Sequence, residues 1–315
     1  MNLKKGLFIE VFLIALFWGT SFVAISIALR YITTFDYLSV RWTMAAVVAL
    51  ILIITGVFKV DYRNKSKKGL ITLVLIQPGA YSLLESLGIQ NTSPSETSIM
   101  LALVPITTAF IVAVVLREKV KRSTIISAFI CFTGVVFTVA FEPEFQIGGK
   151  LIGYAFLMAC VVLAGFFYIV SNKISNIYSP TEIVVAMSVG GSICFNIMAL
   201  LNGSLVSGYV AVFTNMPALI ALLYLASFCS ILCFKLHNHV NRNLNPAQAS
   251  LFISNSVTVI GIISAVLITG DSMSIYKAIG VALIIFGVVK HGLNEKKEEK
   301  IYEKEKQISK ENESE

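Results

Sequence analysis

The chain has 315 residues, of which 56% are hydrophobic and 14% are charged, and its mean hydropathy is +0.81. This composition excludes a water-soluble globular protein, because it supplies too few polar residues to cover a globule of this length. The formal net charge of +7 does not call for a nucleic-acid partner, since no basic patch is interleaved with stacking aromatic residues and membrane topology accounts for the excess of Lys and Arg. The composition therefore indicates an all-α integral membrane protein whose surroundings are the lipid bilayer.

The apolar residues divide into ten stretches of membrane-spanning length. In chain order, the predicted transmembrane helices cover residues 7–29, 35–58, 69–89, 95–116, 123–141, 150–171, 182–201, 217–236, 247–269 and 274–290. The first stretch follows Lys4 and Lys5, but its apolar run is longer than the roughly 7–15 residues of a signal-peptide core, so we interpret it as an uncleaved helix.

The basic residues predict the orientation, because Lys and Arg near the ends of transmembrane helices stay in the cytoplasm. With both termini cytoplasmic, 21 of the 25 basic residues fall on the cytoplasmic side. On or near the other side lie Arg30, Arg41, Lys150 and Lys277. A shift by one helix destroys this asymmetry, so we expect a multi-pass protein of the plasma or inner membrane with both termini inside the cell.

The last five predicted helices repeat features of the first five. Matches at four points occur in the same order in both halves: Pro94 with Pro246, Ser98 with Ser250, Glu118 with Asp271, and Gly134-Val135-Val136 with Gly287-Val288-Val289. Each of the two prolines suits the first turn of a helix, where its missing N–H has no cost. Because each half has an odd number of helices, the second half must cross the membrane inverted relative to the first.

We therefore divide the chain into three parts. Residues 1–141 form the first five-helix repeat, and residues 142–292 form the second. Residues 293–315 form a cytoplasmic tail that is rich in Glu and Lys and poor in apolar residues, so it is either disordered or a solvated helix.

Several short motifs occur at defined places along these helices. They are Phe17-Trp18-Gly19-Thr20-Ser21-Phe22 in the first helix, Arg41 early in the second, Asn91-Thr92-Ser93-Pro94 before the fourth, Leu103-Val104-Pro105 within it, Arg117-Glu118-Lys119 after it and Gly134-Val135 in the fifth. In these motifs, and over about residues 7–291, the chain resembles the EamA-type members of the drug/metabolite transporter superfamily, which are built from two five-helix repeats.

The resemblance implies substrate export or exchange by alternating access, through a central cavity lined by helices of both repeats. It implies neither a cofactor nor ATP hydrolysis, and the sequence has no Walker-type Gly-x-x-x-x-Gly-Lys run. The chain departs from the family pattern at Asp271, where a glutamate is usual. It also departs at His237 and His239, which replace smaller or apolar residues.

Arg41 and Glu85 are the ionisable residues that we expect to act in transport. A charged side chain at the centre of a transmembrane helix costs about 2.5–3.5 kcal/mol on insertion scales, so each needs a partner, water or a function. The two residues lie at matching depth below the outer boundary, and we hypothesise that they face the cavity as an ion pair that a zwitterion or a proton opens, with Glu85 as the candidate proton carrier. Alternatively the pair is a permanent clasp between helices, or Arg41 extends to the outer headgroups.

Five other residues complete the candidate site. Trp18 lies far from the membrane interface that tryptophan prefers, so it either walls the cavity or packs between helices. Pro105 breaks a backbone hydrogen bond in the fourth helix, which either frees a carbonyl for the cavity or only kinks the helix. Asn255 either binds substrate or joins helices, while Tyr81 and Tyr168 supply amphipathic surfaces that can share the cavity.

Titratable residues near the cytoplasmic side receive simpler interpretations. Glu10 favourably meets the positive end of the helix dipole, which we prefer to a role in carrying protons. His237 and His239 are two residues apart and so lie on different helix faces, which argues against a joint metal site. With Lys235 and Arg242, they indicate topology-setting charge or a pH-sensitive gate. The five cysteines have none of the spacings of a metal or haem site, so we predict no metal.

We conclude from the sequence that the chain is a secondary transporter, and specifically an exporter, of small organic metabolites such as amino acids or amphipathic compounds. The alternatives are an uncoupled facilitator or channel and a lipid-translocating protein. An enzyme acting on lipid-linked substrates is disfavoured, because no cluster of acids, histidines or metal ligands gathers at one membrane face. Small residues such as Gly190 and Gly191 allow close packing within one chain or in a homodimer.

Overall fold

The computed structural model describes residues 5–115, 126–127, 129–134, 137, 149–287, 289–290 and 293. Within these ranges the regular structure is helical, and eight helical segments are long and apolar enough to cross a membrane. They are Gly6–Ala28, Thr34–Ile54, Lys68–Asn91, Pro94–Val115, Lys150–Ile174, Pro180–Leu201, Met216–Asn243 and Pro246–Thr269. The protein is therefore a multi-pass membrane protein.

These segments correspond to eight of the ten helices that we predicted. About half of the predicted helix at 123–141 lies outside the described residues, as does the charged tail apart from residue 293. The predicted helix at 274–290 corresponds to the shorter apolar helix Ile275–Gly287, and a further short helix, Leu205–Thr214, was not predicted. The eighth predicted helix, 217–236, ends too early, because the helical segment continues to Asn243.

The first half contains α1 (Lys5–Ala28), α2 (Thr34–Ile54), a third span and a fourth span. The third span consists of α3 (Lys68–Val74), the π-helical segment η1 (Leu75–Ala80) and α4 (Tyr81–Asn91). The fourth span is divided into α5 (Pro94–Leu101) and α6 (Val104–Val115).

The second half begins with α8 (Gly149–Ile174) and α9 (Pro180–Leu201), which are followed by the short helix α10 (Leu205–Thr214). Its third span consists of α11 (Met216–Tyr224), η2 (Leu225–Cys233) and α12 (Phe234–Asn243), and α13 (Pro246–Ser264) continues into η3 (Ala265–Thr269). The corresponding spans of both halves are thus interrupted by a π-helical segment.

Helix starts also correspond between the halves. Pro94 opens α5 after the N-cap Ser93, whose side chain accepts a hydrogen bond from the backbone N–H of Glu96. Pro246 opens α13 in the same way after the N-cap Asn245. A capping side chain followed by proline satisfies free N–H groups and fixes the first turn, which explains why both helices begin at these positions.

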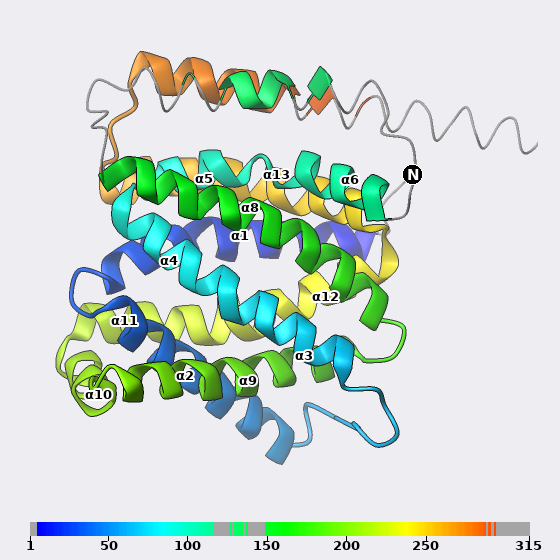
Figure 1. The fold of residues 1–315 in the computed structure, drawn as a ribbon, viewed down its shortest axis with the longest axis vertical. Helices are drawn as coiled ribbons and strands as arrows, with labels where there is room; N and C mark the ends of the chain where they lie inside the picture. The colour runs from blue at the N-terminus through cyan, green and yellow to red at the C-terminus, as the bar shows by residue number, and fades with distance from the viewer. Residues whose placement is uncertain are drawn as a thin grey trace, which may run out of the picture.

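The two halves pack against each other along most of their length. Figure 1 shows α2 beside α9, and further contacts join α1 to α13, α1 to α12 and α4 to α8. Large apolar side chains cover the outside, among them Leu201 and Leu267, which are 82% and 78% exposed. Such exposure suits a surface in contact with lipid tails and leaves the polar side chains inside the bundle.

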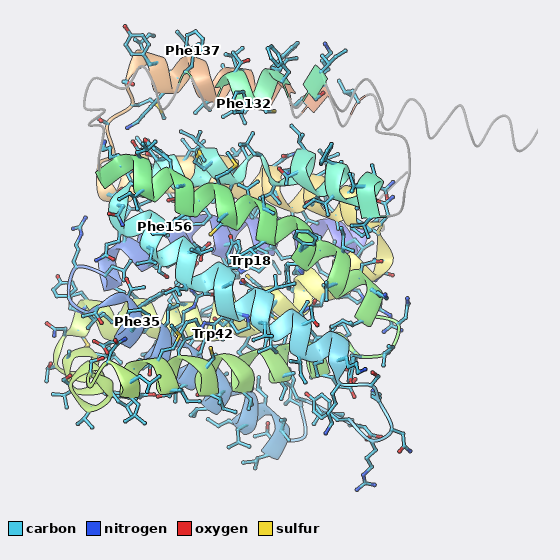
Figure 2. The ribbon with its side chains drawn as sticks, viewed as in Figure 1. Trp18, Phe35, Trp42, Phe132, Phe137 and Phe156 are labelled. Carbon is cyan, nitrogen blue, oxygen red and sulfur yellow. The ribbon has the colours of Figure 1, made fainter. Side chains whose placement is uncertain are left out.

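A separate layer is formed by the described residues between 126 and 137 and by Ile275–Gly287, drawn green and orange in Figure 1. Their backbones approach closely at glycines: a Cβ added at Gly134 would lie 2.7 Å from the carbonyl oxygen of Gly280. In Figure 2, Phe132 and Phe137 lie on this layer, whereas Trp18 and Trp42 lie inside the main bundle.

Candidate functional site

A cavity of about 90 Å³ lies inside the bundle, and its volume is sufficient for several water molecules. Its wall takes residues from both halves of the chain. They are Trp18, Ser21, Phe22, Arg41, Gln77, Tyr81, Glu85, Leu101, Val104, Ala164, Phe167, Tyr168, Phe234, His237, Ile253, Ser254 and Val257. Five of the six predicted substrate-binding residues are among them: Trp18, Arg41, Tyr81, Glu85 and Tyr168.

Trp18 both lines the cavity and holds α1 against the second half. Its indole N–H donates to the carbonyl oxygen of Cys229 in η2 at 3.0 Å. Its ring meets Phe234 edge-on, with 5.0 Å between centroids, and lies 5.4 Å from the ring of His237. The two interpretations that the sequence left open, cavity wall and helix packing, therefore both describe this side chain.

Arg41 is held by residues other than the expected carboxylate. Its guanidinium donates from Nη1 to the hydroxyl of Tyr37 at 2.6 Å and from Nε to the hydroxyl of Ser230 at 3.2 Å. It also lies over the rings of Tyr37 and Trp42, at 5.8 and 5.4 Å from their centroids. The side chain is buried, so the alternative in which Arg41 extends to outer headgroups is wrong for this conformation.

Glu85 faces the same cavity and accepts a hydrogen bond from the hydroxyl of Tyr81 at 3.0 Å. Between these two described side chains, Arg41 and Glu85, the structure has no direct ion pair, which corrects our expectation. The physical reason is local, because a tyrosine lies one helical turn before each of these two residues. Tyr37 is within hydrogen-bond reach of the Arg41 guanidinium, and Tyr81 is within reach of the Glu85 carboxylate. The two charges are therefore presented separately to the cavity.

Gln77 was missed by the sequence analysis. Its backbone is extended (φ −140°, ψ 116°) inside η1, where Pro78 cannot donate a helical hydrogen bond. This break turns the buried Gln77 side chain to the cavity, where its Oε1 has no hydrogen-bond partner among the described atoms. A glutamine followed by proline in the middle of an apolar stretch is the signal that could have identified it.

His237 corrects a second interpretation, since it is not a topology-setting charge at the helix end. It is 0% exposed, lines the cavity and stacks on Phe167 with 4.8 Å between ring centroids. His239, two residues further along α12, instead places Nδ1 2.8 Å from the carboxylate of Glu10. Glu10 therefore joins α1 to α12 through this contact, which the helix-dipole interpretation did not include.

Asn255 is absent from the cavity wall, and its neighbour Ser254 lies there instead. Consecutive helical residues point about 100° apart, and the cavity-facing side of α13 carries Ser254 and Val257, so the role of Asn255 in binding substrate or joining helices stays a prediction. The hydroxyl of Ser254 lies 3.5 Å from that of Tyr168, which joins α13 to α8 across the cavity.

The break expected near Pro105 is present between α5 and α6, at residues 102–103. Proline at this position cannot donate to the carbonyl of Leu101, the residue four positions earlier. Leu101 and Val104, on either side of the break, both line the cavity.

One carboxylate, Glu182, fastens the loop between α2 and α3 to the start of α9. Both of its oxygens lie 2.8 Å from Nζ of Lys65, and they also accept from the backbone N–H groups of Asp61 and Ser179 at 2.8 Å each. The hydroxyl of Ser179 in turn accepts a hydrogen bond from the backbone N–H of Glu182, which completes a capping box. The carboxylate is buried and has a donor for each oxygen.

A second carboxylate, Asp271, binds the start of α5. Its Oδ2 accepts from the backbone N–H and the hydroxyl of Ser95 at 3.1 and 2.7 Å, and its Oδ1 accepts from the hydroxyl of Thr269 at 2.8 Å. Partial burial of the carboxyl raises its pKa, but the hydrogen bonds from Ser95 and Thr269 outweigh burial and leave the pKa below its ordinary value.

Comparison with known proteins matches both halves of the chain to one family. The EamA-like transporter family matches residues 6–140 and again residues 151–290. The "Uncharacterized transporter YcxC" of Bacillus subtilis is 26% identical over 300 residues, covering 93% of this chain and 95% of that protein. The "Uncharacterized transporter YyaM" of the same organism is 24% identical, covering 87% of this chain and 90% of that protein.

Solved structures share this fold, and one of them is a close example of the same helix arrangement. It superposes with a TM-score of 0.68 at 14% sequence identity, covering 92% of this chain and 98% of that one. At this identity the likeness concerns the arrangement of helices alone.

Proposed function

Because the chain belongs to the EamA-like transporter family, we propose that it is a secondary transporter that exports small organic solutes across the cell membrane by alternating access. The family and the transporter relatives favour this class over an enzyme. The observation that carries the proposal is the cavity, whose wall comes from both halves of the chain and contains one guanidinium and one carboxylate among aromatic and aliphatic side chains.

The proposed substrates are amino acids and related zwitterionic or amphipathic metabolites. A guanidinium has five N–H groups, and that of Arg41 donates two of them, to the hydroxyls of Tyr37 and Ser230. The others are left as donors for a substrate carboxylate. Glu85 receives only the hydroxyl of Tyr81, so it retains acceptor capacity for a substrate ammonium. Separate charges of opposite sign on one cavity wall match the charge distribution of a zwitterion, and the surrounding aromatic rings suit its apolar part.

The proposed topology has ten transmembrane helices in two inverted five-helix repeats, residues 1–141 and 142–292, with both termini in the cytoplasm. Side-chain contacts support it, because they join segments that this topology places on the same side. Lys65 and Glu182 meet on the predicted cytoplasmic side. Lys277 lies 3.8 Å from Glu96 on the other side.

Alternating access requires places where the helices bend. The third span of each half is interrupted at η1 or η2, and the fourth span is divided between α5 and α6. η1 and the break between α5 and α6 lie next to the cavity, since Gln77 and Leu101 line it, and Phe234, which directly follows η2, lines it as well. We propose that they absorb the change of backbone angles when one repeat rocks against the other.

The test is counterflow of radiolabelled amino acids and related metabolites in proteoliposomes, measured at two pH gradients. We expect saturable flux that collapses in Glu85→Gln, because the substrate ammonium loses its charged partner. Glu10→Gln is the matched control, since it changes a carboxylate outside the cavity wall. Flux that does not saturate with solute identifies a channel, and saturable flux unchanged in Glu85→Gln removes this carboxylate from the mechanism.

A further inference from the structure

The imidazole of His237 is enclosed by aromatic rings inside the cavity. Phe167 stacks on it at an interplanar angle of 20°, Tyr168 lies 4.8 Å from it at a tilt of 59°, and Trp18 lies 5.4 Å away. Phe234, one turn earlier on α12, packs against both Trp18 and Phe167. These contacts fix the orientation of the His237 ring, so its polar edge has a defined direction.

That polar edge is unused within the described part of the protein. Neither Nδ1 nor Nε2 of His237 has a hydrogen-bond partner, and the same is true of Oε1 of Gln77. Both side chains are buried and both line the cavity. A buried polar group without a partner is costly to folding, so such groups mark places where a ligand or ordered water completes the hydrogen bonding.

The other uncharged polar groups on the cavity wall are already engaged. The indole N–H of Trp18 is bound to Cys229, the hydroxyl of Ser21 donates to the carbonyl of Trp18, and the hydroxyl of Tyr81 donates to Glu85. His237 and Gln77 therefore differ from the other uncharged polar residues of the wall in having capacity left for a ligand.

We propose that His237 and Gln77 form a hydrogen-bonding subsite for a planar nitrogen heterocycle. A neutral imidazole offers one donor and one acceptor, and the carbonyl of Gln77 accepts a further N–H. A flat ring that carries both an N–H group and an acceptor nitrogen can bind two of these three groups at once, and its faces match the aromatic wall formed with Trp18 and Phe234. This inference rests on the proposed function, in that it assigns the uncharged part of the transported solute to this part of the cavity.

Binding can be measured without transport. Isothermal titration calorimetry on the purified full-length protein in detergent compares benzimidazole, which has a ring N–H and a ring acceptor, with 1-methylbenzimidazole, which lacks the N–H, and with indane, which lacks both. We expect benzimidazole to bind about tenfold or more tightly than indane, a difference of about 1.4 kcal/mol, with the methylated compound between them. Equal affinities in the wild-type protein, or no binding of any of the three, would overturn the proposal.

Two variants locate the binding. His237→Phe keeps an aromatic ring against Phe167 but removes the polar edge, so benzimidazole should bind it no better than indane. His239→Phe is the matched control, because His239 lies on the same helix, outside the cavity wall, and should keep the wild-type preference. A preference that survives in His237→Phe contradicts the assignment. If this variant does not fold, the three-compound series on the wild-type protein still decides.

The result is distinguishable from that of the transport assay. Benzimidazole binding that depends on His237, in a protein that shows no saturable counterflow, supports the subsite and refutes the transporter proposal. Saturable counterflow with no preference among the three probes supports the transporter proposal and refutes the subsite, and the unpaired atoms of His237 and Gln77 then bind water only.

Discussion

Replacing Glu182 with alanine removes a buried carboxylate that fastens the loop between α2 and α3 to α9. The carboxylate has three donor groups: Nζ of Lys65 and the backbone N–H groups of Asp61 and Ser179. Removing one partner of a buried ion pair costs about 3–5 kcal/mol, and losing a helix cap costs about 0.5–2 kcal/mol. The ammonium of Lys65 regains water, since its side chain is 26% exposed, so we expect the low end of this range, a loss of about 3 kcal/mol in the free energy of unfolding.

Glutamine at the same position gives a graded result. Glu182→Gln keeps one acceptor oxygen and remains a residue that capping boxes use, so it should lose only about 1–2 kcal/mol. The measurement is reversible unfolding by SDS titration in mixed micelles, followed by far-UV circular dichroism.

Glu10→Ala is the matched control for this series. Glu10 also contacts a basic side chain, that of His239, but the Glu10 side chain is 21% exposed and that of His239 is 48% exposed, so the loss should stay below about 1 kcal/mol. The reasoning is refuted if Glu182→Ala and Glu10→Ala destabilise the protein equally, or if Glu182→Ala unfolds within about 1 kcal/mol of the wild type.

Packing and charge lead to three further expectations. Gly191→Ala should destabilise the protein by about 1–3 kcal/mol in the same titration, because the added Cβ would lie 2.6 Å from Pro78 and 2.9 Å from Trp42, whereas Gly6→Ala, with no neighbour within 4 Å, should have little effect. Asp271→Asn should lower stability at pH 7. Because the folded-state pKa of Asp271 is lowered, its contribution is fully present above the unfolded pKa of about 3.9 and is lost as the pH falls through the folded-state pKa, so the difference between the two proteins in unfolding measurements should shrink as the pH falls below about 3.9. An unchanged difference at low pH contradicts this assignment. Arg41→Lys should raise the KM for counterflow about tenfold, equivalent to about 1.4 kcal/mol, because lysine keeps the charge but cannot reproduce the planar fork of donors. An unchanged KM would show that Arg41 does not contact the solute.

The number and length of most transmembrane helices were predictable, because the thickness of the bilayer directly sets the length of an apolar stretch. Residues that are unusual within an apolar stretch were also informative. Arg41 and Glu85 carry charges that are costly in lipid, Trp18 lies far from the interface that tryptophan prefers, and all three line the cavity. Which face of α13 meets the cavity was less readable, because three consecutive polar residues, Ser254, Asn255 and Ser256, point to different sides of the helix. For this reason the sequence pointed to Asn255 in place of its neighbour Ser254.

Two other differences arose from local geometry. The helical segment that contains His237 continues to Asn243, so a residue assigned to the cytoplasmic end of a helix lies within it. The direct ion pair expected between Arg41 and Glu85 is replaced by hydrogen bonds to Tyr37 and Tyr81. Spacing of one helical turn was visible in the sequence, but it did not reveal which partner each charge prefers.

The central claim, that solute passes through the cavity shared by the two halves, is tested most directly by blocking the cavity. Ser21→Cys places a thiol on its wall in a background whose five native cysteines are replaced, and Ser188→Cys places one at a buried position of α9 outside the wall. Treatment of proteoliposomes with a membrane-impermeant thiol reagent should abolish counterflow in Ser21→Cys and leave it intact in Ser188→Cys. Full counterflow after complete labelling of Ser21→Cys would contradict the account.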